Sequence, residues 1–445
     1  MNRILIFLMI SLMATTCHRI NNKPNPEDPE EVELDGTYTP VSIHRSVDAV
    51  QPSTGLVLWS DNARSRNAKY GETITLEYAY CLPCKVVKGK KNDKIQYDWS
   101  SFDSWLNSVA SRNHQAVVRF RYEYPGSRDV DGQPGTTAVP DYIKALEDYN
   151  ETYYDNPEDG PTWYADWSNA ELQWFTKQFY TDFNEVYKKD QRIAFVEVGF
   201  GHWSEYHIYA TPLKPGQNFP TAEYQAEFLT HLNTALEIPW LISIDAAEKS
   251  PIVDNSSLMA LTFGMFDDSF MHKSHEKGYN EECWNALGKG TRWQTGACGG
   301  EISYYTDNDQ RNFLNPEGMY GVTWEKAASK YHITFMIAND APGSKYGTAD
   351  RFKEAGMVCG YNFKLTGLYV NGSGTAVKVT NTGIAPIYRD AYVAVGGVRG
   401  ETSLKGLLPG KERLVFVKKI TDGTDVTIVS DYILPTQTIQ FDADL

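Results

Sequence analysis

The chain has 445 residues, a formal net charge of −15 at pH 7 and an aromatic content of 13%, including 28 Tyr and 11 Trp. This length accommodates one large domain and a smaller one. The acidic balance, without any basic stripe, argues against a nucleic-acid partner. Flat aromatic side chains suit both a large core and a surface that stacks on sugar rings.

The first 17 residues have the features of an export signal. Arg3 precedes the almost wholly apolar run Ile4 to Met13, which is too short to span a membrane as a helix in a mature protein. Small residues then lead to Cys17, and together they resemble a bacterial lipoprotein signal, although Ala14 stands where Leu is usual. This resemblance implies a lipidated Cys17 and an anchor of acyl chains as the only membrane association. Plain secretion is the alternative.

Residues 18–44 are expected to form an acidic linker. Pro and acidic residues alternate over Pro24–Glu31, so this stretch lacks the apolar side chains that a packed core requires. The segment resembles the leaders of surface-exposed lipoproteins in Bacteroidetes-like bacteria. The resemblance implies a protein anchored at the outer membrane of a Gram-negative bacterium, on the cell surface or in the periplasm.

Eight strand-like segments alternate with helical segments through the middle of the chain. The strands are expected at residues 55–59, 74–80, 116–122, 192–198, 240–245, 258–267, a segment ending at 301, and 331–340. Helices are expected from Ser100, from Pro140, from the capping box Ser168–Glu171 to about residue 189, and from Thr221. Strand and helix in eightfold alternation predict a (β/α)8 TIM barrel over residues 45–355. Residues 123–167 form a long insertion, expected at the rim of the barrel.

After residue 360 the pattern changes to short alternating strands separated by Gly, Asn and Pro turns. These strands are expected at residues 363–370, 375–380, 391–396, 413–417 and 427–429. They predict a small all-β sandwich domain over residues 360–445.

The fourth strand is expected to have one apolar and one charged face. By the period of two, Val196 and Val198 share a face with Ala194 and Phe200, whereas Glu197 shares the other with Ile193, Phe195 and Gly199. An apolar face suits the surrounding helices and the Glu197 face suits the barrel interior. The neighbouring strands are expected to point Glu77, Arg119 and Arg121 inward, so that a buried network of these three and Glu197 balances its charges. The two Arg side chains could instead bind substrate or keep Glu301 ionised.

Two carboxylates follow strand ends at the same face of the predicted barrel. Glu205 lies just beyond the fourth strand and Glu301 ends the seventh. Retaining glycoside hydrolysis requires such a pair, one to protonate the leaving oxygen and one to attack the anomeric carbon, about 5 to 5.5 Å apart. Glu197 is the competing acid, although its expected position in the interior favours a structural role.

The motifs Gly199-Phe-Gly-His-Trp-Ser-Glu-Tyr-His207 and Gly299-Gly-Glu301 resemble the clan of (β/α)8 retaining glycosidases. More narrowly, they resemble an uncharacterised family of secreted bacterial glycosidase-like barrels with a trailing β-domain. The resemblance implies that Glu205 is the acid/base and Glu301 the nucleophile. The clan usually has Asn before its acid/base, to bind the sugar 2-OH, whereas this chain has Ser204. A non-catalytic glycan-binding lipoprotein is therefore the alternative to a glycoside hydrolase acting on a poly- or oligosaccharide.

Other side chains near these strand ends are candidates for binding substrate. Trp203 could stack on a sugar, His202 or His207 could tune the acid, and acidic residues at strand ends could bind hydroxyl groups or be solvated. The full candidate set is Arg119, Arg121, His202, Trp203, His207, Asp245, Asp268 and Tyr304, with Asp267 beside Asp268 as a further strand-end carboxylate.

Cysteine usage predicts neither a metal site nor a redox centre. Cys81 and Cys84 have the spacing of such sites, but no second pair or paired His completes a zinc site. They are expected to form a local disulfide or to remain two buried thiols. No catalytic metal and no cofactor are expected.

Overall fold

The structure is a computed structural model that describes residues 34, 36–60, 70–126, 137–275, 277–338, 343, 345–418 and 425–445. The expected export signal, Cys17 and most of the expected linker lie outside the described residues, as do the last two residues of the expected eighth strand. Residues 37–445 form one compact unit.

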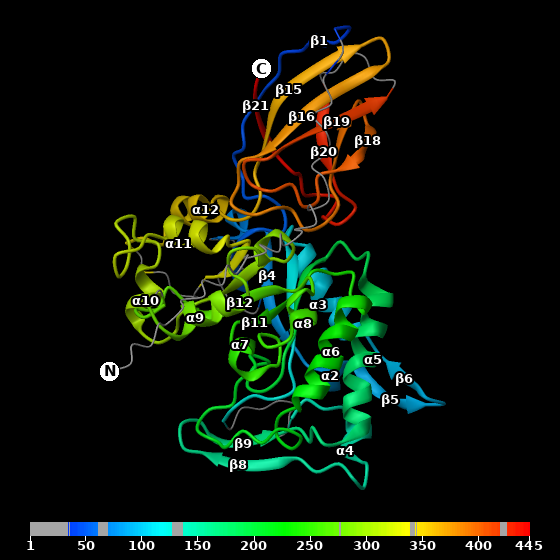
Figure 1. The fold of residues 1–445 in the computed structure, drawn as a ribbon, viewed down its shortest axis with the longest axis vertical. Coiled ribbons are helices and arrows are strands. Elements are labelled where there is room, and N and C mark those ends of the chain that lie inside the picture. Colours follow the sequence, from blue (N-terminus) through cyan, green and yellow to red (C-terminus); the bar gives the residue numbers. More distant parts are fainter. Residues whose placement is uncertain are drawn as a thin grey trace, which may run out of the picture. The chain divides into compact units, whose positions relative to one another are not determined.

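Eight parallel strands close into a barrel, which confirms the predicted (β/α)8 fold (Figure 1). In a parallel barrel the carboxyl ends of all strands meet at one face, so side chains distant in sequence come together there. In order around the barrel the strands are β3 (Gly55–Trp59), β4 (Leu76–Cys81), β7 (Gln115–Phe120), β10 (Ile193–Glu197), β11 (Trp240–Ser243), β12 (Gly264–Phe270), β13 (Cys298–Ile302) and β14 (Phe335–Ile337).

Helices surround the strands and bury their outer faces in one large apolar cluster. The longer helices are α3 (Ser100–Ala110), α5 (Ala170–Tyr187), α6 (Ala222–Ala235), α9 (Tyr279–Ala286), α11 (Trp324–Tyr331) and α12 (Ala349–Met357). The short ones are η1 (Gly71–Thr73), α2 (Pro83–Val86), α4 (Asp141–Lys144), α7 (Ala246–Lys249), α8 (Ser256–Met259), η2 (Arg292–Gln294) and α10 (Asp307–Asn312). Among the described residues, no helix combines the length and apolarity needed to cross a membrane.

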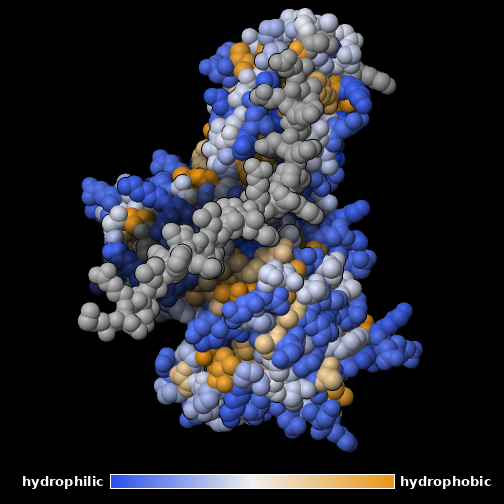
Figure 2. Space-filling view, viewed as in Figure 1, coloured by the Kyte–Doolittle hydropathy of each residue, from blue (hydrophilic) through white to orange (hydrophobic). Residues whose placement is uncertain are grey.

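Two β-hairpins interrupt the alternation of strands and helices. The hairpin β5 (Val87–Lys91) and β6 (Lys94–Tyr97) projects from the barrel and has a hydrophilic surface (Figures 1 and 2). The hairpin β8 (Thr152–Asn156) and β9 (Gly160–Tyr164) lies within the predicted insertion. The sequence pattern predicted neither hairpin.

Several element boundaries differ from the prediction because local capping decides them. Residues 256–259 form α8 instead of the start of the sixth strand, since the Asn255 side chain accepts hydrogen bonds from the first amides of that helix. Helix α5 is capped by Asn169 rather than by Ser168. The first turn of α3 is bonded by Asp98, which accepts from the Ser100 amide and hydroxyl, so Ser100 is not the cap.

The interior of the barrel is apolar at the level of the strand centres. Phe195 and Phe335 stack there with ring centroids 4.9 Å apart. A β-bulge at the start of β10 exchanges the sides that its first two side chains were expected to face: Ala194 faces the barrel interior and Ile193 faces the helices. Val196 and Val198 face outward, as predicted.

The prediction that Glu77 faces the interior is wrong. Leu76 and Tyr78 occupy the inward positions of β4, so Glu77 lies on the outer side. There its carboxylate accepts hydrogen bonds of 2.6 Å from both Nε and Nη2 of Arg112, and it lies 2.7 Å from the His114 ring. Glu77 is therefore balanced by the loop after α3 and takes no part in the interior network.

The C-terminal part is a two-layer β-sandwich around its own apolar cluster. One sheet has the order β19 (Glu412–Lys418), β16 (Gly374–Asn381), β15 (Phe363–Asn371) and β21 (Phe441–Asp444), and the other has β18 (Val398–Ser403), β17 (Tyr392–Val395) and β20 (Val426–Val429). The short strands β1 (Thr39–Pro40) and β2 (His44–Arg45) pair with β15 and β21. The expected linker therefore does not extend to residue 44.

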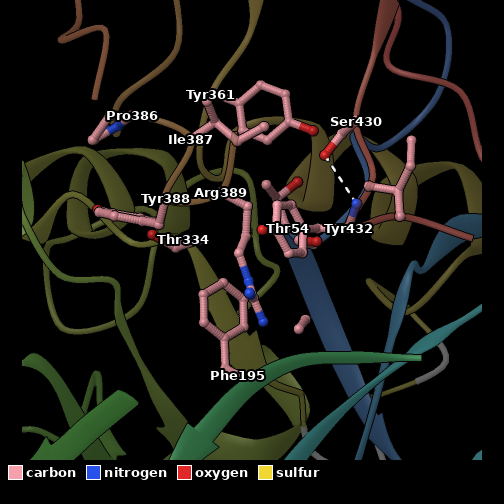
Figure 3. A pocket seen from close by; sticks show the side chains of 13 residues that line it. Thr54, Phe195, Thr334, Tyr361, Pro386, Ile387, Tyr388, Arg389, Ser430 and Tyr432 are labelled. Atoms are coloured by element: carbon pink, nitrogen blue, oxygen red, sulfur yellow. Dashed lines mark hydrogen bonds between the residues drawn. The ribbon is translucent and has the colours of Figure 1, made fainter. Parts of the chain in front are cut away.

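The sandwich contributes side chains to the amino-terminal end of the barrel. Tyr388 belongs to the interior apolar cluster and its hydroxyl donates a 2.6 Å hydrogen bond to the Trp293 carbonyl. Beside it, the Arg389 guanidinium lies over the Tyr432 ring and bonds the Lys188 carbonyl. Figure 3 shows Tyr388 and Arg389 entering a pocket that is also lined by Phe195 of β10.

Candidate active site

Glu205 lies on a tightly folded loop beyond β10. The non-glycine residues Trp203, Ser204 and Tyr206 all have positive φ, at 53°, 65° and 62°. Each such residue costs roughly 1–2 kcal/mol, and strain of this kind clusters at functional sites. Gly199 makes the fold of the loop possible, because a Cβ at this position would lie 1.9 Å from the Ser204 carbonyl oxygen.

Glu301 lies at the carboxyl end of β13 and is 6% exposed. Its Oε1 accepts hydrogen bonds from Trp59 Nε1 at 2.9 Å and from the Tyr304 hydroxyl at 2.8 Å. The preceding Gly300 has φ +136°, and a Cβ there would lie 2.1 Å from the Asp267 carbonyl oxygen. Glycine therefore allows β12 and β13 to approach closely while Glu301 is held by two donors.

Arg119 connects the carboxylates in the interior. Its guanidinium is fully buried and lies 2.7 Å from Glu197, 2.9 Å from Glu205 and 2.8 Å from Asp268. It also lies 4.1 Å from the ring centre of Phe266, above the apolar interior. The predicted pairing of Arg119 with Glu197 is present, and the same cation also holds the candidate acid Glu205.

Burial raises the pKa values of Glu205 and Glu301. The pKa of Glu301 rises to about 8, because the carboxyl is buried and the charge of Asp268 opposes its ionisation. Burial and Asp268 also raise the pKa of Glu205 well above its ordinary value, against the opposing effect of Arg119. The ionisation of both carboxyls therefore depends on the charges of the same two neighbours, Asp268 and Arg119.

Asp267 and Asp268, predicted at a strand end, lie inside β12 and have different roles. Asp267 is buried and accepts hydrogen bonds from Trp284 Nε1 and Asn280 Nδ2, at 2.9 and 2.8 Å. It therefore fixes α9 against the barrel. Asp268 turns to the opposite side and joins Arg119 and the candidate pair.

The predicted histidines His202 and His207 lie on the Glu205 loop itself, on either side of Glu205 in the sequence. His207 Nδ1 lies 2.5 Å from Asp245 Oδ2, so a hydrogen bond joins two candidates that were predicted separately. His202 is fully buried, its Nε2 lies 2.9 Å from the Tyr164 hydroxyl, and burial together with His207 lowers its pKa to about 3. His202 is therefore a neutral structural ring at neutral pH, whereas His207 positions the loop through Asp245.

Aromatic side chains line the carboxyl-end face. Trp59 lies edge-on to Tyr78 and Tyr80, at 4.7 and 5.0 Å between ring centroids. Trp203 is partly exposed and lies edge-on to Tyr124 at 5.9 Å. Tyr304 and its neighbour Tyr305 are exposed after β13, at 49% and 72%. Rings of this kind provide flat apolar faces suited to sugars.

Sequence reasoning did not identify Trp59, Tyr78 or Tyr80 as site residues. Only the position of Trp59 in the sequence could have indicated it, because Trp59 ends the first predicted strand. Tyr78 and Tyr80 alternate on the inward side of the second strand, a side that had been assigned to Glu77. The predicted candidates Arg119, Asp268, Glu205, Glu301 and Tyr304 do come together.

The Ser204 side chain forms a hydrogen bond with the backbone. It is fully buried and its hydroxyl donates a 2.9 Å hydrogen bond to the Phe120 carbonyl. Ser204 therefore ties the Glu205 loop to the end of β7 rather than presenting its hydroxyl to a sugar.

Cys81, at the end of β4, and Cys84, in α2, are partly buried thiols that form no disulfide with each other. Burial raises the pKa of Cys81 to about 12, which makes its thiol unreactive at neutral pH. Among the described residues, no group of three or more His, Cys, Asp or Glu has the arrangement of a metal site.

Neither a protein-family model nor a curated protein matches this sequence. Among solved structures, the chain is similar to a GH30 endoxylanase from Clostridium papyrosolvens, with 10% identity, a TM-score of 0.42 and coverage of 88% of this chain and 97% of that chain. A β-amylase catalytic domain from Paenibacillus polymyxa has 12% identity, a TM-score of 0.42 and coverage of 69% and 99%. Endo-glycoceramidase II from a Rhodococcus species has 8% identity, a TM-score of 0.40 and coverage of 86% and 99%. Similarities of this size identify no reaction for this chain.

Proposed function

We propose that the protein is a retaining glycoside hydrolase that acts on a poly- or oligosaccharide. The proposal rests on one observation: Glu205, beyond the end of β10, and Glu301, near the end of β13, belong to one electrostatic cluster at the same face of the barrel. This reaction requires two carboxyl groups, one on each side of the glycosidic bond that is cleaved.

The environments of the two carboxyls support different roles. Glu301 accepts two hydrogen bonds at one oxygen, which favours its ionised, nucleophilic form. Burial and the charge of Asp268 raise the pKa of Glu205 well above its ordinary value, which favours the protonated form that a general acid needs. In the proposed reaction, Glu301 attacks the anomeric carbon as Glu205 protonates the departing oxygen. Water then hydrolyses the glycosyl-enzyme with Glu205 acting as base.

A non-catalytic glycan-binding protein is the second candidate. It is favoured by Ser204, whose hydroxyl is bonded to the Phe120 carbonyl and does not supply the contact expected at the sugar 2-OH. It is also favoured by the ion pair between Arg119 and Glu205, which opposes protonation of the acid. In this case the same aromatic face would bind glycans without cleaving them.

The test is turnover of a panel of polysaccharides and aryl glycosides by the full chain. Glu301→Ala should abolish activity on every substrate, and azide should restore part of it by replacing the missing carboxylate. Glu205→Ala should retain more activity on aryl glycosides with good leaving groups than on natural linkages, because protonation then contributes less to the rate. Glu354→Ala, at an exposed side chain, is the matched control.

Two results would count against these assignments. Binding of glycans without any turnover would favour the second candidate. Full activity of Glu205→Ala on natural substrate, with loss in Glu197→Ala, would transfer the role of the acid to Glu197.

We also propose that the protein acts at the bacterial cell envelope, anchored through a lipidated Cys17. The support is the sequence of the first 17 residues and the acidic segment that follows. An extracellular or periplasmic position suits a protein whose substrate is a polymer outside the cell.

A further inference from the structure

Arg121 differs from Arg119 in having no acidic partner in the part of the chain that the structure describes. It follows β7, and because residues alternate along a strand it lies on the same inward side as Arg119, nearer the carboxyl end of the barrel. Arg121 is 8% exposed, and its Nε and Nη1 have no hydrogen-bond partner among the described residues. Arg119, by contrast, is surrounded by three carboxylates.

Aromatic rings hold the Arg121 guanidinium without using its N–H groups. The group lies 5.2 Å from the ring centre of Tyr80 and 4.6 Å from that of Tyr124. Such cation–π contacts partly offset the burial of the charge, but they leave the donors at the edge of the guanidinium unsatisfied. A guanidinium keeps its proton in proteins, so a buried charge with unpaired donors remains at this position.

The position of Arg121 relates it to both halves of the proposed catalytic pair. Tyr80 packs against Trp59, which binds Glu301. Tyr124 packs against Trp203, which precedes Glu205 by two residues in the loop. Arg121 therefore lies between two aromatic pairs. Tyr80 and Trp59 lead to the proposed nucleophile, and Tyr124 and Trp203 lead to the loop of the proposed acid.

We propose that Arg121 binds an anionic substituent, a carboxylate or a sulfate ester, carried by the glycan substrate at or next to the cleaved linkage. The identification of the ligand as a glycan rests on the proposed function. Both substituents present several oxygens to one guanidinium, and such charge-assisted hydrogen bonds satisfy the unpaired donors. A neutral glycan leaves the charge of Arg121 uncompensated, because the carboxylates of Glu197, Glu205 and Asp268 are already paired with Arg119.

The test measures binding by calorimetry, with Glu301→Gln in the full chain to prevent turnover. The probes are matched oligosaccharides: glucuronoxylan and oligogalacturonate fragments against their carboxyl-reduced forms, and sulfated galactan fragments against their desulfated forms. We expect one anionic member to bind at least about tenfold more tightly than its neutral partner. Arg121→Gln should remove this preference, whereas Arg121→Lys should retain part of it.

Arg399→Gln in the β-sandwich is the matched control, and thermal unfolding verifies that each variant is folded. The carboxyl-reduced and desulfated arms distinguish a uronate ligand from a sulfated one. Equal binding of all matched pairs, binding of no member, or a preference that survives Arg121→Gln would overturn the inference. Selective binding that depends on Arg121, without turnover of that glycan by the unsubstituted protein, would uphold the anion site and overturn the proposed hydrolysis.

Discussion

Replacing Tyr304 by Phe should shift the acid limb of the pH–activity profile to higher pH. The Tyr304 hydroxyl donates a 2.8 Å hydrogen bond to Glu301, which stabilises the ionised carboxylate. Hydrogen bonds to charged groups contribute about 1.5–3 kcal/mol, and because Tyr304 is 49% exposed, water can replace part of this, which favours the lower value. One pKa unit corresponds to about 1.4 kcal/mol, so the loss of this bond should raise the pKa of Glu301 by about one unit.

The measurement is kcat/KM against pH on an activated aryl glycoside that the protein cleaves. In the unsubstituted protein the acid limb should reflect ionisation of Glu301, whose pKa of about 8 results from burial and Asp268. In Tyr304→Phe the same limb should lie about one unit higher, because a donor that favours the ionised form is absent. Tyr305→Phe is the control, since Tyr305 is adjacent and exposed but forms no described hydrogen bond with Glu301. An acid limb that does not move, or moves to lower pH, would refute the assignment of Glu301 as the ionised nucleophile.

Three further predictions concern the cluster, the loop and the anchor. Asp268→Asn removes the charge that raises the pKa values of Glu205 and Glu301, so both limbs of the pH profile should move to lower pH; unchanged limbs would contradict the coupling. Gly199→Ala places a Cβ against the Ser204 carbonyl oxygen and should lower both activity and the melting temperature, at a cost of about 1–3 kcal/mol, whereas Gly290→Ala, which meets no neighbour, should be neutral. Cys17→Ser should release the protein from the membrane fraction of the expressing bacterium, and unchanged retention would exclude lipidation as the anchor.

The barrel was predictable from the sequence because its strands are short, apolar and regularly separated by helices. The first strand was predicted with its observed bounds, Gly55–Trp59. The sixth and eighth strands were predicted to begin too early, because apolar residues at 258–259 and 331 belong to helix ends, and periodicity alone does not distinguish a buried helix turn from a buried strand.

The charged residues show which features of the site cannot be predicted from the sequence. Glu197 and Arg119 were placed correctly because alternation along a single strand determines which way they point. Glu77 was placed incorrectly, since its partners Arg112 and His114 come from a neighbouring loop whose approach no periodicity encodes. Likewise, the contact between Trp59 and Glu301 depends on closure of the barrel, which brings the first strand into the same sheet as the last two.

The side chain of Tyr388 in the floor of the barrel has a consequence for the order of folding during synthesis. All eight barrel strands leave the ribosome before Tyr388 is made, so the nascent barrel lacks part of its interior cluster until the sandwich sequence follows. The strands β1 and β2 are synthesised before their partners, and they cannot pair until β15 and β21 have been made. We therefore expect the barrel to reach its native stability only after release of the complete chain, and to be a poor candidate for transfer as an isolated unit into other proteins.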